Sequence, residues 1–347
     1  MGAVRYSLVV PVYCNEASIP DLVAAVSRVD RALDHALEAV FVVDGSPDHS
    51  YERLDAALPA SGLTAQLIAL SRNFGSSSAV REGLAAARGD YMAMMAADLQ
   101  EPEELILDFF RAVETEPIDV AFGVRTGRSD PLTTRAASAT FWWVYRRFVQ
   151  PEIPPGGIDV FACNRAFRDH LLRLHESNSS LVGQIVWLGF RRKLVPYRRL
   201  PRRHGRSAWS FARKVKYLLD SMFAFSDLPI RALTWVGAAG LAVSVALALT
   251  VLAAKIIGAI PVPGYAATVL TIIFFAALNS FGLGIIGSYT WRAYENTKAR
   301  PHAIVLHSKT FGETGVDMSA AGPSQGANCS PSGGSAAATA ASVGVQE

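Results

Sequence analysis

The sequence contains little cysteine, and this scarcity excludes two kinds of protein. Three cysteines occur among 347 residues, at Cys14, Cys163 and Cys329, without a CxxC pair or an accompanying histidine pattern. We therefore expect neither a disulfide framework nor a structural zinc site, and a reducing compartment fits this usage. The formal net charge of +3 is small, so it gives no indication of a nucleic-acid partner.

A secretion signal is also missing from the sequence. The chain begins MGAVRYSLVVPVY, without a charged stretch, a long apolar run and a small-residue cleavage site in that order. We therefore expect the first domain to remain in the cytoplasm. Basic residues gather instead between Arg191 and Lys216, just before the most apolar part of the chain. Such a cluster is typical of a membrane-surface or phosphate-binding face, and equally of a solvated basic surface.

Charged residues are absent from two long apolar segments, Leu233–Ala254 and Tyr265–Tyr289. Each is about long enough to cross a bilayer, and the short connector between them predicts a helical hairpin. Arginine and lysine lie before the first segment and after the second, so the positive-inside rule places both ends in the cytoplasm. This pattern predicts a multi-pass protein of the inner (cytoplasmic) membrane, with a buried core hairpin as the alternative.

The segments around the hairpin set the predicted domain boundaries. Residues 209–231 include an amphipathic stretch, Trp209–Ser226, which suits a helix lying on a membrane surface or packing against the rest of the protein. The end of the chain is rich in Ser, Gly and Ala, which predicts disorder after about residue 309. We therefore expect a catalytic domain at 1–208, membrane-surface helices at 209–231, a transmembrane hairpin at 232–291 and a cytoplasmic tail at 292–347.

The first 125 residues alternate between apolar runs and helical periodicity, which predicts a parallel α/β sheet. The expected strands are Tyr6–Val12, Ala39–Val43, Gln66–Leu70, Tyr91–Ala96 and Asp119–Gly123, and the expected helices include Ile19–Leu37 and Ser76–Arg88. Ligands of such sheets bind at the carboxyl ends of the strands. Asp44 and Asp98 each follow an expected strand, so both are candidate site residues.

The two aspartates suit different chemistry. Asp44 begins an Asp-Gly-Ser turn, where its carboxylate could accept hydrogen bonds from a nucleobase or ribose, although such a sequence is also an ordinary turn. Asp98 and Gln100 place an acid and an amide oxygen two residues apart. Oxygen ligands of this kind hold a hard divalent cation, which neutralises a diphosphate leaving group. A helix cap before Glu101-Pro102 is the alternative, and both can be true.

Taken in order, several motifs resemble one known family. These are VVPVYCNE (Val9–Glu16), VVDGSPD (Val42–Asp48), LSRNFG (Leu70–Gly75) and AADLQEPEEL (Ala96–Leu105). Their order and spacing resemble family 2 glycosyltransferases with the GT-A fold. GGIDVFACNR (Gly156–Arg165), RRHGRS (Arg202–Ser207), FSDLPIR (Phe225–Arg231) and GIIGSY…RPHAIV (Gly284–Val305) look like the polyprenyl-phosphate branch, which includes dolichyl-phosphate mannose synthase and bactoprenol glucosyl transferases. The resemblance covers about residues 5–306.

The resemblance implies a fold and a set of site residues. The fold would be α/β, a GT-A-type nucleotide-sugar-binding domain with a C-terminal two-helix transmembrane hairpin. Asp98, Asp159 and Arg125 would be catalytic, with Asp159 in a positioning or phosphate-site role. Pro11, Tyr13, Glu16 and Asp44 would hold the nucleoside, Asp98 and Gln100 would ligate Mg²⁺ or Mn²⁺, and Arg128, Arg135, Arg202 and Arg206 would lie at the acceptor loop or the phosphates. Guanidinium groups suit phosphate oxygens, with ordinary surface charge as the alternative.

The implied reaction is inverting transfer of a sugar from a nucleotide diphosphate sugar to polyprenyl phosphate, for cell-envelope glycosylation. A UDP-sugar is the leading donor. A lipid phosphate carries about one to two negative charges at neutral pH, so it needs little help from a general base. Catalysis should then depend on positioning and on neutralising the departing diphosphate.

The sequence also departs from the family pattern. Ala96 replaces the first acid of the usual pair, Val43 replaces an Asp or Asn, and Ala208 stands where many relatives have lysine, with Arg206 nearby. A non-catalytic, membrane-anchored nucleotide-sugar binder is therefore one alternative. A processive polysaccharide synthase is another, although the chain lacks a QxxRW motif and has one hairpin. Small residues at Gly282, Gly284 and Gly287 leave a homo-oligomer open.

Overall fold

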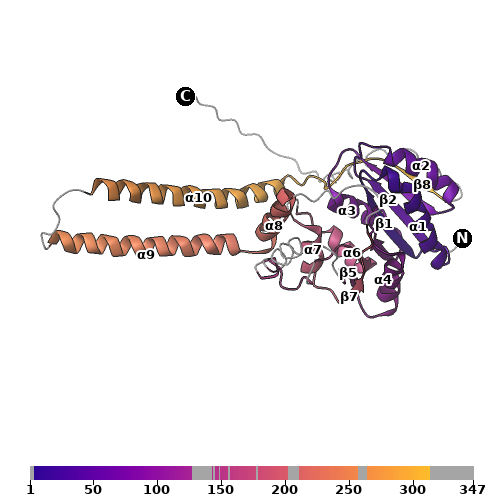
Figure 1. The fold of residues 1–347 in the computed structure, drawn as a ribbon, viewed down its shortest axis with the longest axis horizontal. Coiled ribbons are helices and arrows are strands. Elements are labelled where there is room, and N and C mark those ends of the chain that lie inside the picture. Colours follow the sequence, from indigo (N-terminus) through magenta and orange to yellow (C-terminus); the bar gives the residue numbers. More distant parts are fainter. Residues whose placement is uncertain are drawn as a thin grey trace, which may run out of the picture. The chain divides into compact units, whose positions relative to one another are not determined.

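Strands from the first two hundred residues and one strand near residue 308 form a single mixed β-sheet (Figure 1). The computed structural model describes residues 4–126, 143, 145–147, 149–154, 157–176, 179–201, 211–256 and 264–312. These residues form an eight-stranded sheet in the order β7-β5-β6-β4-β1-β2-β3-β8. Its strands are β1 (Tyr6–Val12), β2 (Leu37–Val43), β3 (Thr64–Leu70), β4 (Tyr91–Met94), β5 (Val120–Arg125), β6 (Phe161–Asn164), β7 (Arg192–Tyr197) and β8 (Val305–Phe311).

Helices connect the strands and cover the sheet. They are the 3₁₀ turn Glu16–Ser18 and helices α1 (Ile19–Ala32), α2 (Ser50–Ser61), α3 (Ser76–Ala86), α4 (Glu103–Thr115), α6 (Arg165–Leu172), α7 (Leu181–Trp187), α8 (Phe211–Phe225), α9 (Leu228–Ile256) and α10 (Tyr265–Thr297). Local sequence explains several of the ends. Pro20 stands in the first turn of α1, where its missing N–H costs nothing. Gly62 ends α2 in the left-handed conformation, with φ +72°.

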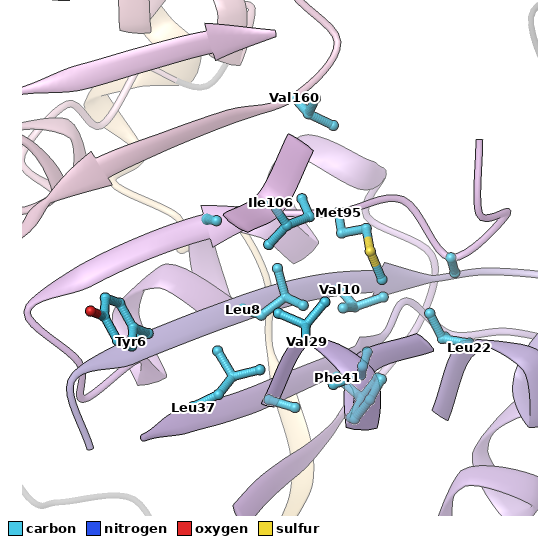
Figure 2. Packing of buried hydrophobic residues seen from close by; sticks show 14 of the residues in the cluster. Tyr6, Leu8, Val10, Leu22, Val29, Leu37, Phe41, Met95, Ile106 and Val160 are labelled. Atoms are coloured by element: carbon cyan, nitrogen blue, oxygen red, sulfur yellow. The ribbon is translucent and has the colours of Figure 1, made fainter. Parts of the chain in front are cut away.

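The core lies on both faces of the sheet, and β1 shows why its sequence is apolar without interruption. Successive strand side chains point to opposite faces. Leu8 and Val10 accordingly belong to a cluster with α1 and α4, whereas Val9 belongs to a second cluster with α3, α6 and α7. Figure 2 shows the first cluster, in which Phe41 of β2 and Ile106 of α4 lie near Leu8 of β1. Burial on both faces is typical of parallel strands inside an α/β sheet.

The sheet is mixed, although the five strands predicted within residues 1–125 run parallel to one another, as expected. β1 pairs in parallel with β2 and β4, and β2 with β3, as the alternating pattern predicts. β6 instead runs antiparallel to its neighbours β4 and β5. The start of β6 therefore lies at the same edge as the carboxyl ends of the parallel strands. This reversal places the residues just before β6 at the edge where ligands of α/β sheets bind.

The chain after α10 returns to the sheet, which the predicted tail did not anticipate. β8 pairs antiparallel with β3 and runs to Phe311, so regular structure continues past the predicted limit at about residue 309. Lys309 contacts the carboxylate of Asp55 at 2.7 Å, and His307 packs edge-on against Tyr51. Just before the strand, the backbone N–H of Ser71 donates to the carbonyl of Ile304 at 2.9 Å. The end of the described chain is thereby joined to the loop after β3.

The two predicted apolar segments form the long helices α9 and α10, but their crossing of a bilayer is not confirmed. A search of the described residues finds no helix with the length and apolar character needed to traverse a membrane. Leu233 of α9 lies against Gly282 of α10, which links the two helices. In α8, Leu218 and Met222 pack against the second core cluster while Leu219 is exposed. Part of the amphipathic face thus packs against the protein.

Candidate active site

The candidate site lies at one edge of the sheet, where most strands end. The parallel strands β1 to β5 and β7 all finish at this edge, and β6 begins there because it runs the other way. Asp44 follows β2, Asp98 follows β4 and Asp159 precedes β6. The fold therefore brings together side chains that are far apart in the sequence.

Asp44 organises the loop after β3. Its two carboxylate oxygens accept the backbone N–H groups of Phe74 at 2.7 Å and Gly75 at 2.8 Å. Burial raises the pKa of Asp44, while these two hydrogen bonds act in the opposite direction. Gly45 has φ +55°, and a Cβ there would lie 2.2 Å from the carbonyl carbon of Arg72. Asp44 is 2 % exposed, so the structure gives it a loop-holding role, and its predicted nucleoside contact stays a prediction.

The other predicted nucleoside residues lie at the end of β1. Pro11 pairs with Val42 in the sheet, directly before the Asp44 turn. Tyr13 is exposed, so its ring is accessible to a ligand. The carboxylate of Glu16 contacts Arg53 at 2.8 Å, and it also accepts the backbone N–H of His49 at 3.3 Å. Glu16 therefore supports the start of α2, and its ligand role stays a prediction.

Asp98 and Gln100 lie in a tight turn after β4. Leu99 between them has φ +54°, an uncommon conformation for a residue with a side chain, which often marks a functional turn. The backbone N–H of Gln100 donates to Oδ1 of Asp98 at 3.3 Å. The side-chain nitrogen of Gln100 donates to the carbonyl of Leu200 at 3.2 Å, which fixes how the amide is turned. The turn therefore holds both predicted metal ligands beside the segment that follows β7.

The turn at Asp98 offers a divalent cation a small set of protein ligands. Within the described ranges, no three His, Cys, Asp or Glu side chains form a group that would hold a metal ion. Mg²⁺, however, is usually held by one or two carboxylates together with substrate phosphates and water. Half-buried Asp98 and the amide of Gln100 supply hard oxygen donors of that kind. The residues present therefore fit a cation whose remaining ligands come from the substrate.

Arg125, Asp159 and Tyr197 form a charged cluster at the ends of β5, β6 and β7. Arg125 and Tyr197 are paired across β5 and β7, so their side chains begin next to each other. Nη2 of Arg125 donates to Oδ1 of Asp159 at 2.6 Å, and Nε contacts the second carboxylate oxygen. The hydroxyl of Tyr197 donates to Oδ2 of Asp159 at 3.1 Å. Gly123 on β5 leaves room for the Tyr197 ring, since a Cβ there would lie 3.3 Å from it.

The pKa shifts of Arg125 and Tyr197 agree with the contacts that both side chains make with Asp159. Burial pulls the pKa of Arg125 down, but the charge and hydrogen bonds of Asp159 outweigh it, so the pKa is raised. Burial raises the pKa of Tyr197, and the charges of Asp159 and Glu101 add to the effect. The cluster therefore holds a guanidinium cation and a protonated tyrosine hydroxyl, both directed at one carboxylate.

Glu101 and Tyr197 were not among the predicted site residues. Glu101 is buried, and its carboxylate accepts the backbone N–H of Ala96 at 3.2 Å. Burial raises the pKa of Glu101 to about 7, with the charge of Asp98 adding to the rise. An acid thus lies beside Ala96, the position where the usual family acid is missing. The sequence signal for Tyr197 was its place at the end of the strand-like run RKLVPY.

Four predicted phosphate-binding arginines cannot be placed. Arg128, Arg135, Arg202 and Arg206 lie outside the described residues, so their roles stay predictions. Of the predicted catalytic residues, Arg125 and Asp159 are brought into direct contact. Asp98 lies at the same sheet edge, and its charge and that of Asp159 both act on the carboxyl group of Glu101.

Comparison with known proteins identifies the family. Residues 7–174 match the model of glycosyl transferase family 2. An uncharacterized glycosyltransferase of Synechocystis sp. is 31% identical over 306 residues, covering 87% of this chain and 95% of that protein. The chain therefore belongs to glycosyl transferase family 2, whose nucleotide-sugar-binding GT-A-type α/β fold agrees with the mixed sheet described above.

Other relatives carry more specific names. The bactoprenol glucosyl transferase of Shigella phage SfX is 28% identical over 306 residues, covering 88% of this chain and 100% of that protein. A prophage homolog of this enzyme in Escherichia coli K12 is also 28% identical, with coverages of 88% and 99%. Among solved structures, the mannosyltransferase PcManGT of Pyrobaculum calidifontis, in complex with GDP-Man and Mn²⁺, aligns at 19% identity. Its TM-score is 0.45, with 86% of each chain covered, a likeness too slight to bear on donor or metal.

Proposed function

We propose that this protein transfers a sugar, with inversion, from a nucleotide diphosphate sugar to polyprenyl phosphate. The observation that carries the proposal is the cluster of Arg125, Asp159 and Tyr197 at the same sheet edge as Asp98. A cation at this edge suits an acceptor that is itself an anion. The names of the bactoprenol glucosyl transferase relatives support the polyprenyl acceptor and glucose as the sugar. A UDP-sugar, in particular UDP-glucose, is the donor that we propose.

The chemistry follows from the charges. An oxygen of the lipid phosphate forms a bond to the anomeric carbon as the bond from that carbon to the nucleotide diphosphate breaks. The diphosphate leaves with the electron pair, so negative charge grows on the leaving side. Arg125 would attract and orient the acceptor phosphate, because a planar guanidinium pairs well with phosphate oxygens. Asp159 is already bound by Arg125 and Tyr197, so it would position the guanidinium.

The proposed cofactor is Mg²⁺ or Mn²⁺, held by Asp98 and Gln100. When bound, such an ion would neutralise the charge of the departing diphosphate. On the other side of the edge, Asp44 would keep the loop after β3 in place for the nucleoside, through its bonds to Phe74 and Gly75. The exposed ring of Tyr13 would then provide a surface on which a base can stack.

We also propose that the protein acts at the cytoplasmic membrane, with α9 and α10 in contact with lipid. Large apolar side chains on both helices are exposed, and they include Trp235, Leu249 and Ile256 on α9 and Phe274, Phe281 and Leu283 on α10. Exposed apolar surface of this extent is typical of contact with lipid or with another protein. A homo-oligomer through α10 remains part of the proposal, since a Cβ at Gly284 or Gly287 would meet nothing within 4 Å.

The proposal is tested by supplying purified protein with radiolabelled nucleotide sugars and polyprenyl phosphate. We expect label in a lipid that is stable to mild base and released by mild acid, as a sugar phosphodiester should be. Formation of polymer would favour a processive synthase. Binding of nucleotide without turnover would favour a non-catalytic binder, the alternative that Ala96 suggests. A panel of UDP- and GDP-sugars in the same assay identifies the donor.

A further inference from the structure

A polar cavity lies between α3, α7 and the segment that precedes β8. Its volume is about 160 Å³, and its lining includes Ser77, Ser78, Arg81, Glu176, Gln184 and His302. A water molecule needs about 10–15 Å³ by a comparable measure, so the space accommodates several waters or a group as large as a phosphate. None of these residues belongs to the cluster of Arg125, Asp159 and Tyr197.

The floor of this cavity carries a buried positive charge. Arg81 is 6% exposed, and its guanidinium donates to the carbonyls of Leu171 and Leu174 and to the side-chain oxygen of Gln184. All three acceptors are neutral, whereas buried charges are normally paired with an opposite charge. Burial lowers the pKa of Arg81, although the negative charges of Glu176 and Glu82 act to raise it. A site with this floor favours a ligand that brings negative charge.

One wall presents a histidine nitrogen that has no hydrogen-bond partner among the described residues. A hydrogen bond to the backbone of Leu174 holds the ring of His302, and its Nε2 atom is buried and unpartnered. Burial lowers the pKa of His302, and the positive charges of Arg81 and His175 lower it further. The surroundings of this ring are therefore electropositive. Glu176 is exposed to solvent and bound to the amide of Gln184 at 2.7 Å, so it offsets that potential only in part.

The mouth of the cavity lies at the N-terminus of α3. Ser77 and Ser78 stand in the first turn of this helix. No acidic residue lies in that turn, and the N-cap residue, Gly75, provides no side-chain cap. The N–H groups and the dipole of a helix N-terminus favour anions, phosphate above all. Ser77 is exposed, so a ligand has access from solvent. Ser77 and Ser78 thus line the same space as Arg81 and His302. The hydroxyl of Ser78 donates to the carbonyl of Phe74 at 3.4 Å and would turn from it to donate to a bound anion.

We propose that this cavity binds a phosphate group, held by Arg81, the hydroxyls of Ser77 and Ser78, and His302. Free inorganic phosphate and the phosphate head group of a lipid share this chemistry, and both are sources that the site would accept. The bound anion would draw a proton onto Nε2 of His302, which would then donate to a phosphate oxygen. Binding needs no sugar donor and no residue of the Arg125 cluster, so the proposal stands apart from the proposed transfer reaction.

The test uses the full chain with histidine labelled by ¹⁵N, in three arms without nucleotide sugar. The arms are inorganic phosphate, vesicles that contain polyprenyl phosphate, and the same vesicles with polyprenol. The pKa of the His302 ring and the thermal unfolding midpoint are measured in each arm. We expect phosphate to raise the pKa of His302. The charged and titratable groups near this ring are Arg81, His175 and Glu176. We expect His302→Gln and Ser78→Ala each to weaken phosphate binding by about tenfold, because each variant loses one hydrogen bond to a charged ligand.

His307→Gln is the matched control, because His307 lies on β8 against Tyr51 and outside the cavity. This variant should bind phosphate as the unaltered chain does. A response to inorganic phosphate, or to polyprenyl phosphate beyond that to polyprenol, supports the site and identifies its source of phosphate. The proposal is overturned if neither source changes the His302 pKa. It is equally overturned if His302→Gln and Ser78→Ala bind phosphate as tightly as the control.

Discussion

At the scale of single residues, Tyr197 has the clearest unassigned role in the transfer reaction. Its hydroxyl donates to Oδ2 of Asp159, and the opposite side of that carboxylate is bound by Arg125. A carboxylate fixed from two sides holds its guanidinium in one orientation, and precise orientation of the reactants contributes to the rate of such a reaction. Under the proposed function, Tyr197 would therefore be a positioning residue that acts through Asp159.

Replacing Tyr197 with phenylalanine should lower kcat about tenfold. The change removes one hydrogen bond to a charged group, which contributes roughly 1.5–3 kcal/mol, while the ring still fills its space. KM for the nucleotide sugar should change little, since the nucleoside residues lie at the end of β1. Steady-state transfer to polyprenyl phosphate separates the two constants.

Tyr6→Phe is the matched control for this change. The hydroxyl of Tyr6 donates to Glu114 at 2.6 Å, at the start of β1 and far along the strand from the site edge. A tyrosine hydroxyl bound to a carboxylate is removed in both variants, so a general loss of stability would appear in both. If Tyr197→Phe and Tyr6→Phe retain the same kcat, Tyr197 does not position Asp159.

Gly45 should tolerate substitution far less well than Gly62, although both have positive φ. A Cβ at Gly62 would meet nothing within 4 Å, whereas one at Gly45 would lie 2.2 Å from the backbone of Arg72. We expect Gly62→Ala to lower the free energy of unfolding by about 1 kcal/mol, for backbone strain alone. Gly45→Ala should cost about 3 kcal/mol or more, because the loop must also move. Urea unfolding of both variants measures the two losses in free energy of unfolding. Equal losses would show that the backbone at Arg72 moves away from a new Cβ at position 45 without a further cost in stability.

The sequence predicted some residues of the candidate site and missed others. Asp98, Arg125 and Asp159 were predicted as site residues from the family resemblance, and the structure places all three at one sheet edge, while their catalytic roles stay predictions. The contact between Arg125 and Asp159 was not predictable, because it depends on β6 entering the sheet in reverse between β4 and β5. Glu101 was placed in the helix start that follows the cap, and its burial was not predictable because its carboxylate is bound by a backbone N–H, that of Ala96, which leaves no trace in the pattern of side chains.

At the scale of elements, periodicity predicted the five parallel strands β1 to β5, but it predicted neither the parallel β7 nor the antiparallel β6 and β8. The expected strand Tyr6–Val12 is β1 without change, since a strand buried on both faces is apolar throughout. The expected strand Tyr91–Ala96 ends earlier, at Met94, because the chain turns toward Asp98. β8 was assigned to the tail because its side chains are mostly exposed, so hydrophobic alternation gave no signal. Pairing with β3 supplies its stability instead.

Removing β8 should destabilise the catalytic sheet. A chain that ends after Ala303 loses the pairing of β3 with β8 and the contact of Lys309 with Asp55. It also leaves β3 as an exposed edge, and unpaired edges promote association between chains. We expect a lower thermal unfolding midpoint and more aggregation than for a chain that ends after Gly312, which keeps β8 whole. Identical midpoints for the two truncated chains would show that β8 contributes little.

At the scale of the whole molecule, the proposal requires α9 to contact lipid. Trp235 of α9 and Trp187 of α7 are similarly exposed, at 75% and 63%, which makes them a matched pair. In variants that keep a single tryptophan at one of these positions, brominated lipids should quench Trp235 fluorescence strongly and Trp187 fluorescence weakly. The physical reason is that bromine quenches only tryptophans within the apolar layer. Equal quenching of both, or quenching of neither, would contradict the proposed membrane contact of α9.

The central claim is that this family 2 glycosyltransferase moves sugar onto a lipid phosphate through the site at Asp98. The most direct measurement is the transfer of labelled glucose from UDP-glucose to polyprenyl phosphate, with polyprenol as the parallel acceptor. Asp98→Ala is compared with Asp55→Ala, which removes an aspartate that contacts Lys309 instead. We predict label on polyprenyl phosphate alone, a loss of about a hundredfold or more with Asp98→Ala, and no loss with Asp55→Ala. Equal labelling of polyprenol, or full activity of Asp98→Ala, would contradict the account.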